Sequence, residues 1–365
     1  MRIAIACGGT GGHFYPGYVL GKTLRARGHE VLFVLRTQDP AAARLEAEDL
    51  PFIELDLRGM PRSLSPALLS FAWKLAGSLR TARAVVRSWR PAAAAGMGGY
   101  LTFPLAAAAR AEGVPFLLHE SNAVMGLANR LLGRWARIVA LGLPPAGAAP
   151  AHARLVGTPV RPELWRRGEP AAARKELGLE DRPTLLVFGG SQGARAINRL
   201  LPPAVASMKA ARPQVLHLSG PAAEEETRAA YAAAGVAAQV RGYCARMDQA
   251  YAAADVVLCR SGASTLAELA AQAKPALLVP YPFAAENHQE VNARLWETAG
   301  AGRLLREKEL SAEGLARTLG ELFGADGAGK RAAMSDAYPR LGLPPAESCA
   351  DRLADAVEAL GSQIR

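Results

Sequence analysis

The 365-residue sequence has few cysteines, few aromatic residues and no long apolar run, and these shortages narrow what the protein can be. Its four cysteines, at positions 7, 244, 259 and 349, form no Cys-x-x-Cys pair, which argues against a disulfide framework or a zinc site and fits a reducing cytoplasm. No uninterrupted apolar run reaches the roughly 18 residues of a membrane-spanning helix. The N-terminus lacks the pattern of an export signal, so none is expected.

Positive charge is in excess. The 43 lysines and arginines outnumber the 33 aspartates and glutamates and give a formal net charge of +10. Such a balance favours an acidic partner, which is a nucleic acid, an anionic lipid or a phosphorylated substrate. The arginines are spread along the chain without a recognisable RNA- or DNA-binding motif, so we expect no nucleic-acid partner. Genome composition bias is the alternative source of the charge.

One local design occurs twice: an apolar run, a glycine-rich loop and a helical pattern. It opens the chain as "MRIAIACGGTGGHFYPGYVLGKTL" and returns from Pro183 as "PTLLVFGGSQGARAINRLLP". Such a frame aims backbone N–H groups and a helix N-terminus at an anionic guest. Strand-like runs alternate with alanine-rich helical segments, which predicts parallel sheets built from βαβ units. The expected fold class is α/β, with two doubly wound domains and a binding crevice between them.

Prolines at positions 159, 162 and 170 interrupt the periodicity and mark a linker. We therefore place an N-terminal domain at residues 1–160 and a second domain at residues 161–344. Residues 345–365 form an amphipathic pattern that predicts a final helix, which we expect to pack back on the N-terminal domain.

The first glycine loop matches neither common nucleotide-loop pattern. Counted from Gly9 and Gly11, the dinucleotide fingerprint would need glycine at Phe14, and the second predicted strand ends in Arg36 rather than in an acidic residue. No Gly-Lys-Ser/Thr follows, which excludes a Walker loop. The remaining interpretation is a loop whose glycines admit a phosphate or a sugar. The alternative is a tight turn that binds no ligand. A third glycine cluster, "GMGGYLTFP", favours the ligand loop.

The stretch "ADVVLCRSGASTLAELAAQAKPALLVPYP" predicts a strand that ends at Cys259 and a helix that follows a short turn. Ser264 or Thr265 is the expected helix cap, and Glu268 is expected in the first helical turn. A carboxylate there either complements the helix dipole or accepts hydrogen bonds from both hydroxyls of a ribose.

Seven motifs stand in the order and spacing of one known family: "GGTGGH", "GMGGY", "HESN", "GTPVR", "GGSQGARAIN", "CRSGASTLAE" and "ENHQEVNA". The chain resembles the MurG family of bacterial transferases along nearly its whole length. The resemblance implies transfer of N-acetylglucosamine (GlcNAc) from UDP-GlcNAc to the C4 hydroxyl of undecaprenyl-diphospho-N-acetylmuramoyl-pentapeptide, a step of peptidoglycan synthesis. It also implies the GT-B architecture, which is two Rossmann-like doubly wound parallel-sheet domains that face each other across a cleft. In that architecture residues 1–160 would form the acceptor and membrane side, and residues 161–344 would bind the UDP-sugar. No cofactor is expected.

The resemblance assigns roles residue by residue. The implied UDP-GlcNAc contacts are Thr10, Gly11, Gly12, Asn122, Arg161, Ser191, Cys244, Ala263, Ser264, Thr265, Leu266, Ala267, Glu268 and Gln289. The expected contacts of the acceptor's diphosphate are Gly12, His13, Gly98, Gly99 and Tyr100. Cys244 falls where the family grips uracil through its backbone, and Glu268 where it holds the ribose. The sequence departs from the family at Ser121, Thr158 and His288, although a neutral imidazole still offers one hydrogen bond beside Gln289.

Inversion of the sugar by a single displacement is implied, and it needs a base and a stabilised leaving group. His13 is the candidate general base, and a hydrogen bond to a sugar or to the acceptor diphosphate is its alternative role. Ser191, the N–H groups of residues 190–193 and Arg161 are expected to stabilise the departing UDP. No Asp-x-Asp signature is present, so we expect no metal.

An acceptor anchored in lipid predicts a peripheral protein on the cytoplasmic face of the cell membrane. Residues 61–91 mix apolar and basic side chains in a pattern that suits an anionic membrane surface. The expected membrane contacts are Leu68, Leu69, Phe71, Trp73, Leu75 and Leu79. The alternative is an ordinary crossover helix whose leucines face the core.

Three other functions fit parts of the sequence. They are a related GT-B transferase with a diacylglycerol or small glycoside acceptor, a non-catalytic sensor of nucleotide sugars, and a UDP-GlcNAc 2-epimerase. Activity on a soluble acceptor would indicate the first, binding without turnover the second, and release of free N-acetylmannosamine the third.

Overall fold

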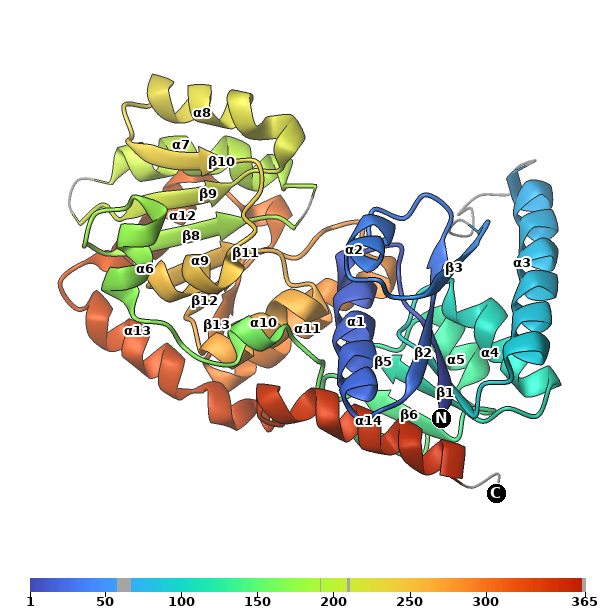
Figure 1. Ribbon diagram of the computed structural model, residues 1–365. Coiled ribbons are helices and arrows are strands. Elements are labelled where there is room, and N and C mark those ends of the chain that lie inside the picture. Colours follow the sequence, from blue (N-terminus) through green and yellow to red (C-terminus); the bar gives the residue numbers. More distant parts are fainter. Residues whose placement is uncertain (58–66, 191, 209–210, 363–365) are drawn as a thin grey trace. The chain divides into compact units, whose positions relative to one another are not determined.

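The computed structural model describes residues 1–57, 67–190, 192–208 and 211–362. The chain divides into two compact units: unit 1 comprises Met1–Arg161 and Leu343–Arg365, and unit 2 comprises Pro162–Gly342. Each unit contains one parallel β-sheet with helices packed on it (Figure 1). The predicted fold class, two α/β domains with parallel sheets, is confirmed.

The sheet of unit 1 has seven strands in the order β3-β2-β1-β4-β5-β6-β7, all paired in parallel. Its strands are β1 (Arg2–Ala6), β2 (Glu30–Arg36), β3 (Phe52–Leu55), β4 (Ala93–Gly96), β5 (Phe116–Glu120), β6 (Ile138–Leu141) and β7 (Ala153–Leu155). The strand order reverses between β1 and β4. Doubly wound sheets bind their ligands at the carboxyl ends of the strands beside such a reversal.

Helices cover both faces of this sheet. Side chains that point to either face of the strands are mostly apolar, so both faces need a covering layer. Ile3 and Ile5 of β1 point into a core cluster shared with α1 (Gly11–Ala26) and α14 (Ala346–Ser362). Ala4 and Ala6 point into a second cluster shared with α3 (Ala67–Trp89), α4 (Thr102–Ala111) and α5 (Leu127–Leu132). The short helix α2 (Ala42–Ala47) follows β2. The helices α3, α4 and α5 therefore form one layer, which we call the α3–α5 layer.

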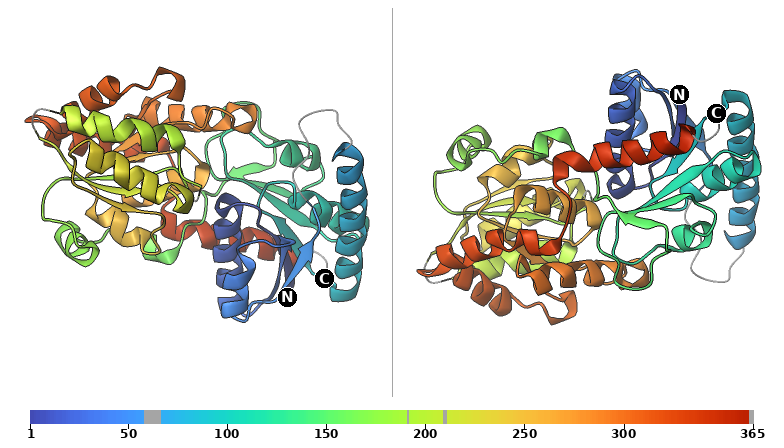
Figure 2. Two further views of the ribbon diagram at one scale, coloured as in Figure 1. Left: turned by 90° about the horizontal axis from the view of Figure 1, so that it is seen from above. Right: turned by 90° about the horizontal axis from the view of Figure 1, so that it is seen from below.

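The last helix, α14, lies against α1 within unit 1 (Figure 2). Arg27, directly after α1, donates to the carboxylates of Asp351, Asp355 and Glu358 at 2.5, 2.6 and 2.9 Å. The carboxylates raise the pKa of Arg27 above its ordinary value. Apolar residues such as Leu353 complete the contact from the core side.

The sheet of unit 2 repeats the strand order of the first, as β10-β9-β8-β11-β12-β13. Its strands are β8 (Thr184–Phe188), β9 (Gln214–Leu218), β10 (Ala238–Arg241), β11 (Val256–Cys259), β12 (Ala276–Leu278) and β13 (Gly302–Leu304). Its helices are α6 (Pro170–Leu177), α7 (Arg195–Ser207), α8 (Glu224–Ala233), α9 (Met247–Ala253), α10 (Ala263–Gln272), α11 (His288–Ala299), α12 (Ala312–Phe323) and α13 (Gly327–Asp336). Here the order reverses between β8 and β11, so the "GGSQG" and "CRSGAST" segments both follow the strands at the reversal.

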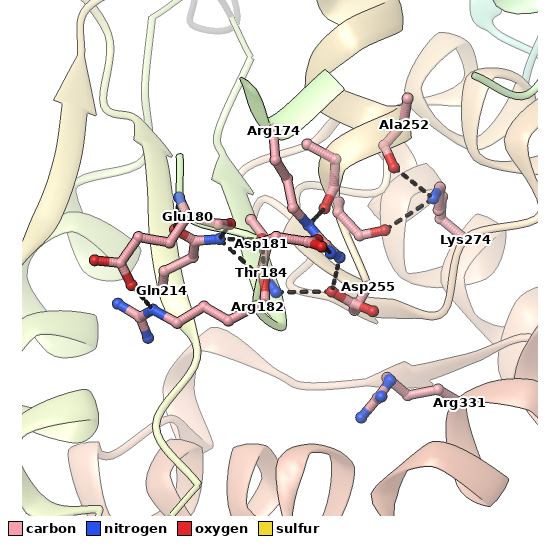
Figure 3. A network of polar contacts seen from close by, with 12 residues as sticks. Arg174, Glu180, Asp181, Arg182, Thr184, Gln214, Ala252, Asp255, Lys274 and Arg331 are labelled. Atoms are coloured by element: carbon pink, nitrogen blue, oxygen red, sulfur yellow. Dashed lines mark hydrogen bonds and ion pairs between the residues drawn. The ribbon is translucent and has the colours of Figure 1, made fainter. Parts of the chain in front are cut away.

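A polar network ties the amino ends of the unit 2 strands together (Figure 3). Asp255, just before β11, accepts hydrogen bonds from the Thr184 backbone N–H at 2.7 Å and from Arg174 at 2.8 Å. Lys274, which precedes β12, donates to the carbonyl of Ala254 at 2.8 Å, and burial lowers the pKa of this lysine to about 8. The network fixes the edge of the sheet opposite to the one that carries the predicted ligand loops.

Candidate active site

The first glycine loop has the predicted design. β1 ends at Ala6, the loop turns through Gly8 and Gly9 with φ of +149° and +79°, and α1 begins at Gly11. The N–H groups of His13 and Phe14 already bond back to the Thr10 carbonyl, at 3.1 and 3.0 Å. Because β1 ends just before this loop, the start of the helix lies at the carboxyl edge of the sheet.

The structure brings the two glycine motifs of unit 1 together at His13. A Cβ atom at Gly98 would lie 3.1 Å from Cδ2 of His13, and one at Gly99 would lie 3.1 Å from Nδ1 of the same ring. Both glycines have positive φ, +91° and +71°, a conformation that other residues adopt only with strain. Nδ1 of His13 also lies 3.2 Å from the Thr10 hydroxyl oxygen. The half-buried imidazole is thus held between the "GGTGGH" and "GMGGY" loops.

Tyr100, the last residue of "GMGGY", lies beside the first loop. A Cβ at Gly9 would stand 3.2 Å from the Tyr100 hydroxyl. Five residues predicted for the acceptor's diphosphate therefore fall in one small region of unit 1.

Asp39 is a site residue that the sequence pattern did not indicate. Its carboxylate is buried and accepts the Gly9 backbone N–H at 2.6 Å and the Ala41 N–H at 3.1 Å. Arg36 approaches the same carboxylate at 3.4 Å. Asp39 therefore fixes the glycine loop and occupies one of its N–H groups. The dinucleotide pattern calls for an acidic residue at the end of the second strand, where this chain has Arg36. Asp39 lies only three residues beyond that strand, and this position was the one signal in the sequence for its role.

Glu120 organises the "HESN" segment, of which only Asn122 was predicted to be functional. Its buried carboxylate accepts four N–H groups: the Asn122 backbone at 3.0 Å, the Asn122 side chain at 3.2 Å, the Gly126 backbone at 2.9 Å and the Asn129 side chain at 2.9 Å. A carboxylate accepts about four hydrogen bonds, so this one is saturated. Glu120 thus holds Asn122 in place.

His119 connects the same segment to the "GTPVR" motif. Its Nε2–H donates to the Gly157 carbonyl at 3.0 Å, and its Nδ1 lies 3.2 Å from the Ser121 hydroxyl. Complete burial lowers the pKa of His119, which keeps the ring neutral.

Arg161, the last residue of the first segment of unit 1, is buried. Its guanidinium lies 4.9 Å from the centre of the Tyr15 ring on α1, and Arg44 lies 5.9 Å from the same ring. Tyr15 thus packs against the predicted diphosphate contact, a role that the sequence alone did not suggest.

In unit 2, α10 begins at Ala263, with Gly262 as an extended N-cap that makes no side-chain cap bond. The predicted cap at Ser264 or Thr265 is therefore wrong, because both residues already lie in the first turn. The placement of Glu268 in the first turn is wrong for the same reason: it is the sixth residue of the helix. Its Oε2 accepts the Tyr251 hydroxyl at 2.9 Å.

Gln289 lies beside the start of α10. Its Oε1 accepts the Tyr281 backbone N–H at 2.9 Å, and a Cβ at Gly262 would lie 3.9 Å from its Nε2. The Ser261 hydroxyl donates to the Gln289 carbonyl at 2.8 Å, which joins α11 to the same turn. His288 donates from Nδ1 to the Ala285 carbonyl at 2.7 Å. The sequence-predicted nucleoside and sugar contacts of this unit are therefore neighbours.

Cys244 and Ser191 are two further predicted contacts of unit 2. Cys244 is buried. Ser191 lies outside the described residues. At Gly193, in the same motif, a Cβ would stand 1.9 Å from the Ser219 carbonyl oxygen, so only glycine fits this position.

The predicted membrane residues of α3 divide into two sets. Leu69 and Trp73 are each 78% exposed and lie four residues apart, on one side of the helix. Phe71 and Leu75 are half-buried and pack against the core shared with β1. Leu68 and Leu79 are half-buried as well.

Comparison with known proteins places the chain in a family. Residues 3–141 match the glycosyltransferase family 28 N-terminal domain, and residues 184–342 match the family's C-terminal domain. A UDP-N-acetylglucosamine--N-acetylmuramyl-(pentapeptide) pyrophosphoryl-undecaprenol N-acetylglucosamine transferase of Elusimicrobium minutum is 37% identical over 98% of this chain and 99% of its own length. The protein of the same name from Halorhodospira halophila is 41% identical over 88% of this chain and 89% of its own.

Solved structures agree. The crystal structure of MurG from Acinetobacter baumannii matches with a TM-score of 0.78 and 26% identity, over 98% of this chain and 99% of its own. A glycosyltransferase of kitacinnamycin matches with a TM-score of 0.69 and 17% identity over 98% of each chain, which shows the fold alone. The predicted GT-B fold class is confirmed. The chain belongs to the MurG family of N-acetylglucosamine transferases, within glycosyltransferase family 28.

Proposed function

We propose that this glycosyltransferase moves GlcNAc from UDP-GlcNAc to the C4 hydroxyl of the N-acetylmuramoyl group in undecaprenyl-diphospho-N-acetylmuramoyl-pentapeptide. The observation that carries the proposal is 37% identity, over nearly the whole chain, to a relative named for this transfer. The acceptor of this transfer is linked to a lipid through a negatively charged diphosphate. The basic composition of the chain suits such an acceptor.

The donor's nucleoside is proposed to lie at the start of α10. Glu268 accepts a hydrogen bond from the Tyr251 hydroxyl, which orients its carboxylate, and a carboxylate at such a site accepts hydrogen bonds from the two hydroxyls of a ribose. Gln289, held by the backbone of Tyr281, is proposed to contact the GlcNAc hydroxyls. The diphosphate is assigned to the N–H groups of residues 190–193 and to Arg161, which stabilise the charge that develops as UDP departs.

The acceptor's diphosphate is proposed to bind to the two glycine loops around His13. With Thr10 beside Nδ1, the imidazole is oriented to take the proton of the C4 hydroxyl as that oxygen attacks the anomeric carbon. The C–O bond to UDP breaks in the same step, so the α-linked donor gives a β-linked product. We expect His13→Ala to lower kcat at least a hundredfold with donor affinity unchanged, and equal losses of both would remove the base role.

Unit 1 is proposed to rest on the cytoplasmic face of the membrane through the α3–α5 layer. Leu69 and Trp73 on α3 and Leu127 and Leu131 on α5 are exposed apolar side chains of this layer. None of the helices within the described ranges has the length and hydropathy of a bilayer span. Double replacement of Leu69 and Trp73 by serine is expected to abolish binding to neutral vesicles without unfolding the protein, and unchanged binding would contradict this contact.

The experiment that tests the activity is product analysis of UDP-GlcNAc incubated with and without a short-chain polyprenyl-diphospho-N-acetylmuramoyl-peptide. UDP release that requires this acceptor supports the proposal. Free N-acetylmannosamine without acceptor indicates an epimerase, and donor binding without any turnover indicates a sensor. Turnover with a soluble glycoside or a diacylglycerol instead indicates another GT-B transferase.

A further inference from the structure

The backbone just before α11 is strained. Glu286 and Asn287, the last two residues before this helix, have φ of +51° and +53°. Few residues other than glycine adopt this left-handed conformation, and asparagine is among those that tolerate it best. A helix ordinarily begins after a residue in the extended conformation, as α10 does after Gly262. Two consecutive left-handed residues therefore persist only where neighbouring groups hold them in place.

Glu290, in the first turn of α11, is the group that holds this start. Its Oε2 accepts the side-chain N–H of Asn287 at 3.1 Å, and its Oε1 accepts Arg294 at 2.7 Å and Arg306 at 3.0 Å. Hydrogen bonds from Arg294, Asn287 and Arg306 lower the pKa of Glu290 to about 2, so its carboxylate is charged at neutral pH. Arg306 follows β13 by two residues, and the carboxylate therefore ties the start of α11 to the end of that strand.

Gln289 is the second residue of α11, so the strained start directly sets its position. Its side chain is fixed as well, because its Oε1 accepts the Tyr281 backbone N–H at 2.9 Å. An N–H group needs an oxygen as its acceptor, so this contact decides which end of the amide is the NH₂ group. The NH₂ group lies next to Gly262, where an added Cβ would stand 3.9 Å from it. The amide thus offers its N–H donors beside the start of α10.

We propose that Asn287 and Glu290 are positioning residues, which place the Gln289 amide for the sugar of the donor. The inference rests on the proposed function, in which Gln289 contacts the GlcNAc hydroxyls. Asn287 and Glu290 act through the turn that carries Gln289, and a side chain held in place before the ligand arrives loses less conformational entropy on binding. The two residues therefore contribute to affinity for UDP-GlcNAc but not for UDP, which has no sugar at this position.

The test is calorimetric titration of the full-length protein with UDP-GlcNAc and, separately, with UDP. Asn287→Ala and Glu290→Ala both remove the hydrogen bond between the two side chains, and alanine at position 287 also disfavours the left-handed conformation. Each variant is expected to bind UDP-GlcNAc more weakly by about fivefold or more, with its affinity for UDP within about twofold of wild type. The KM for UDP-GlcNAc is expected to rise by a similar factor.

Two control variants separate this role from a general loss of structure. Asn287→Gly loses the same side chain, but glycine adopts the left-handed conformation without strain, so this variant is expected to bind UDP-GlcNAc more tightly than Asn287→Ala. Glu313→Ala removes an exposed first-turn glutamate from α12 and is expected to keep both affinities within about twofold of wild type. Equal losses for UDP and UDP-GlcNAc in Asn287→Ala and Glu290→Ala would indicate a merely structural role and overturn the proposal.

Gln289→Ala tests the sugar contact on which the inference rests. This variant is expected to weaken UDP-GlcNAc binding at least as much as Glu290→Ala does and to leave UDP binding unchanged. If Gln289→Ala leaves UDP-GlcNAc binding unchanged, the proposed sugar contact fails and the positioning role fails with it. If Gln289→Ala weakens UDP-GlcNAc binding while Asn287→Ala and Glu290→Ala do not, the sugar contact stands and only the positioning role is overturned.

Discussion

Glu120→Gln probes how the "HESN" segment is positioned. The carboxylate of Glu120 accepts two N–H groups on each oxygen, those of Asn122 on Oε1 and those of Gly126 and Asn129 on Oε2. Glutamine keeps the size of the side chain but turns one oxygen into an NH₂ group. In either orientation that NH₂ group then faces two donors, and both lose their acceptor inside the protein.

The magnitude follows from these two contacts. Hydrogen bonds to a charged acceptor contribute about 1.5–3 kcal/mol each, so losing two of them destabilises unit 1 by about 3 kcal/mol or more, unless the segment moves. Because Asn122 is the predicted sugar contact on this segment, a movement is expected to lower kcat/KM at least tenfold as well. Both effects have one structural cause and are expected to appear together.

The assay is urea unfolding followed by circular dichroism, combined with steady-state kinetics. Glu46→Gln, the same chemical change at an exposed position on α2, is the matched control and is expected to alter neither quantity. If Glu120→Gln unfolds within about 1 kcal/mol of wild type and keeps its kcat/KM, the saturated carboxylate does not organise this segment and the reasoning is refuted.

Three further predictions address the nucleotide, the diphosphate and pH. Glu268→Ala is expected to weaken UDP-GlcNAc binding by about 2–4 kcal/mol in calorimetry, through the loss of two ribose hydrogen bonds; unchanged affinity would reject the ribose role. Tyr15→Leu is expected to raise the KM for UDP-GlcNAc several-fold because it removes the ring that packs against Arg161, whereas Tyr15→Phe keeps the ring and leaves the KM unchanged. Equal KM values in the two variants would contradict this role of the ring. Burial lowers the pKa of His217 from 6.5 to about 3, so the unfolded chain binds this proton first as pH falls, and unit 2 should lose about 2 kcal/mol between pH 7.5 and pH 5. In thermal unfolding, His217→Gln is expected to be less stable than wild type at pH 7.5 but to lose less stability when the pH falls to 5. An equal loss of stability in the two proteins would refute the role of His217.

The backbone frame was predictable from sequence because it rests on local patterns. Apolar runs that end in glycine predicted the strands and loops of both sheets. The pairing of the "GGTGGH" and "GMGGY" loops, which the structure shows as Gly98 and Gly99 beside His13, was also predicted from these motifs. The start of α10 was misplaced because a glycine N-cap with no side-chain bond leaves no signature, so serine and threonine were preferred.

The supporting residues could not be predicted because their roles depend on contacts between distant segments. Asp39 accepts a hydrogen bond from Gly9, thirty residues earlier, and Tyr15 on α1 packs against Arg161, which is far from it in the sequence. Phe71 and Leu75 shared an apolar pattern with Trp73, and only the packing of α3 on the sheet separates buried from exposed members. Patterns along a helix give its apolar residues but not which of them a neighbouring layer covers.

The central claim is acceptor-dependent transfer of GlcNAc, and one measurement tests it most directly. Purified protein is incubated with UDP-GlcNAc labelled in the sugar and with a short-chain polyprenyl-diphospho-N-acetylmuramoyl-peptide, and label in the lipid fraction is compared with UDP released. The account predicts label in lipid that matches UDP release, requires the acceptor and disappears in the His13→Ala variant. Wild-type protein that binds the donor but places no label in lipid would contradict it.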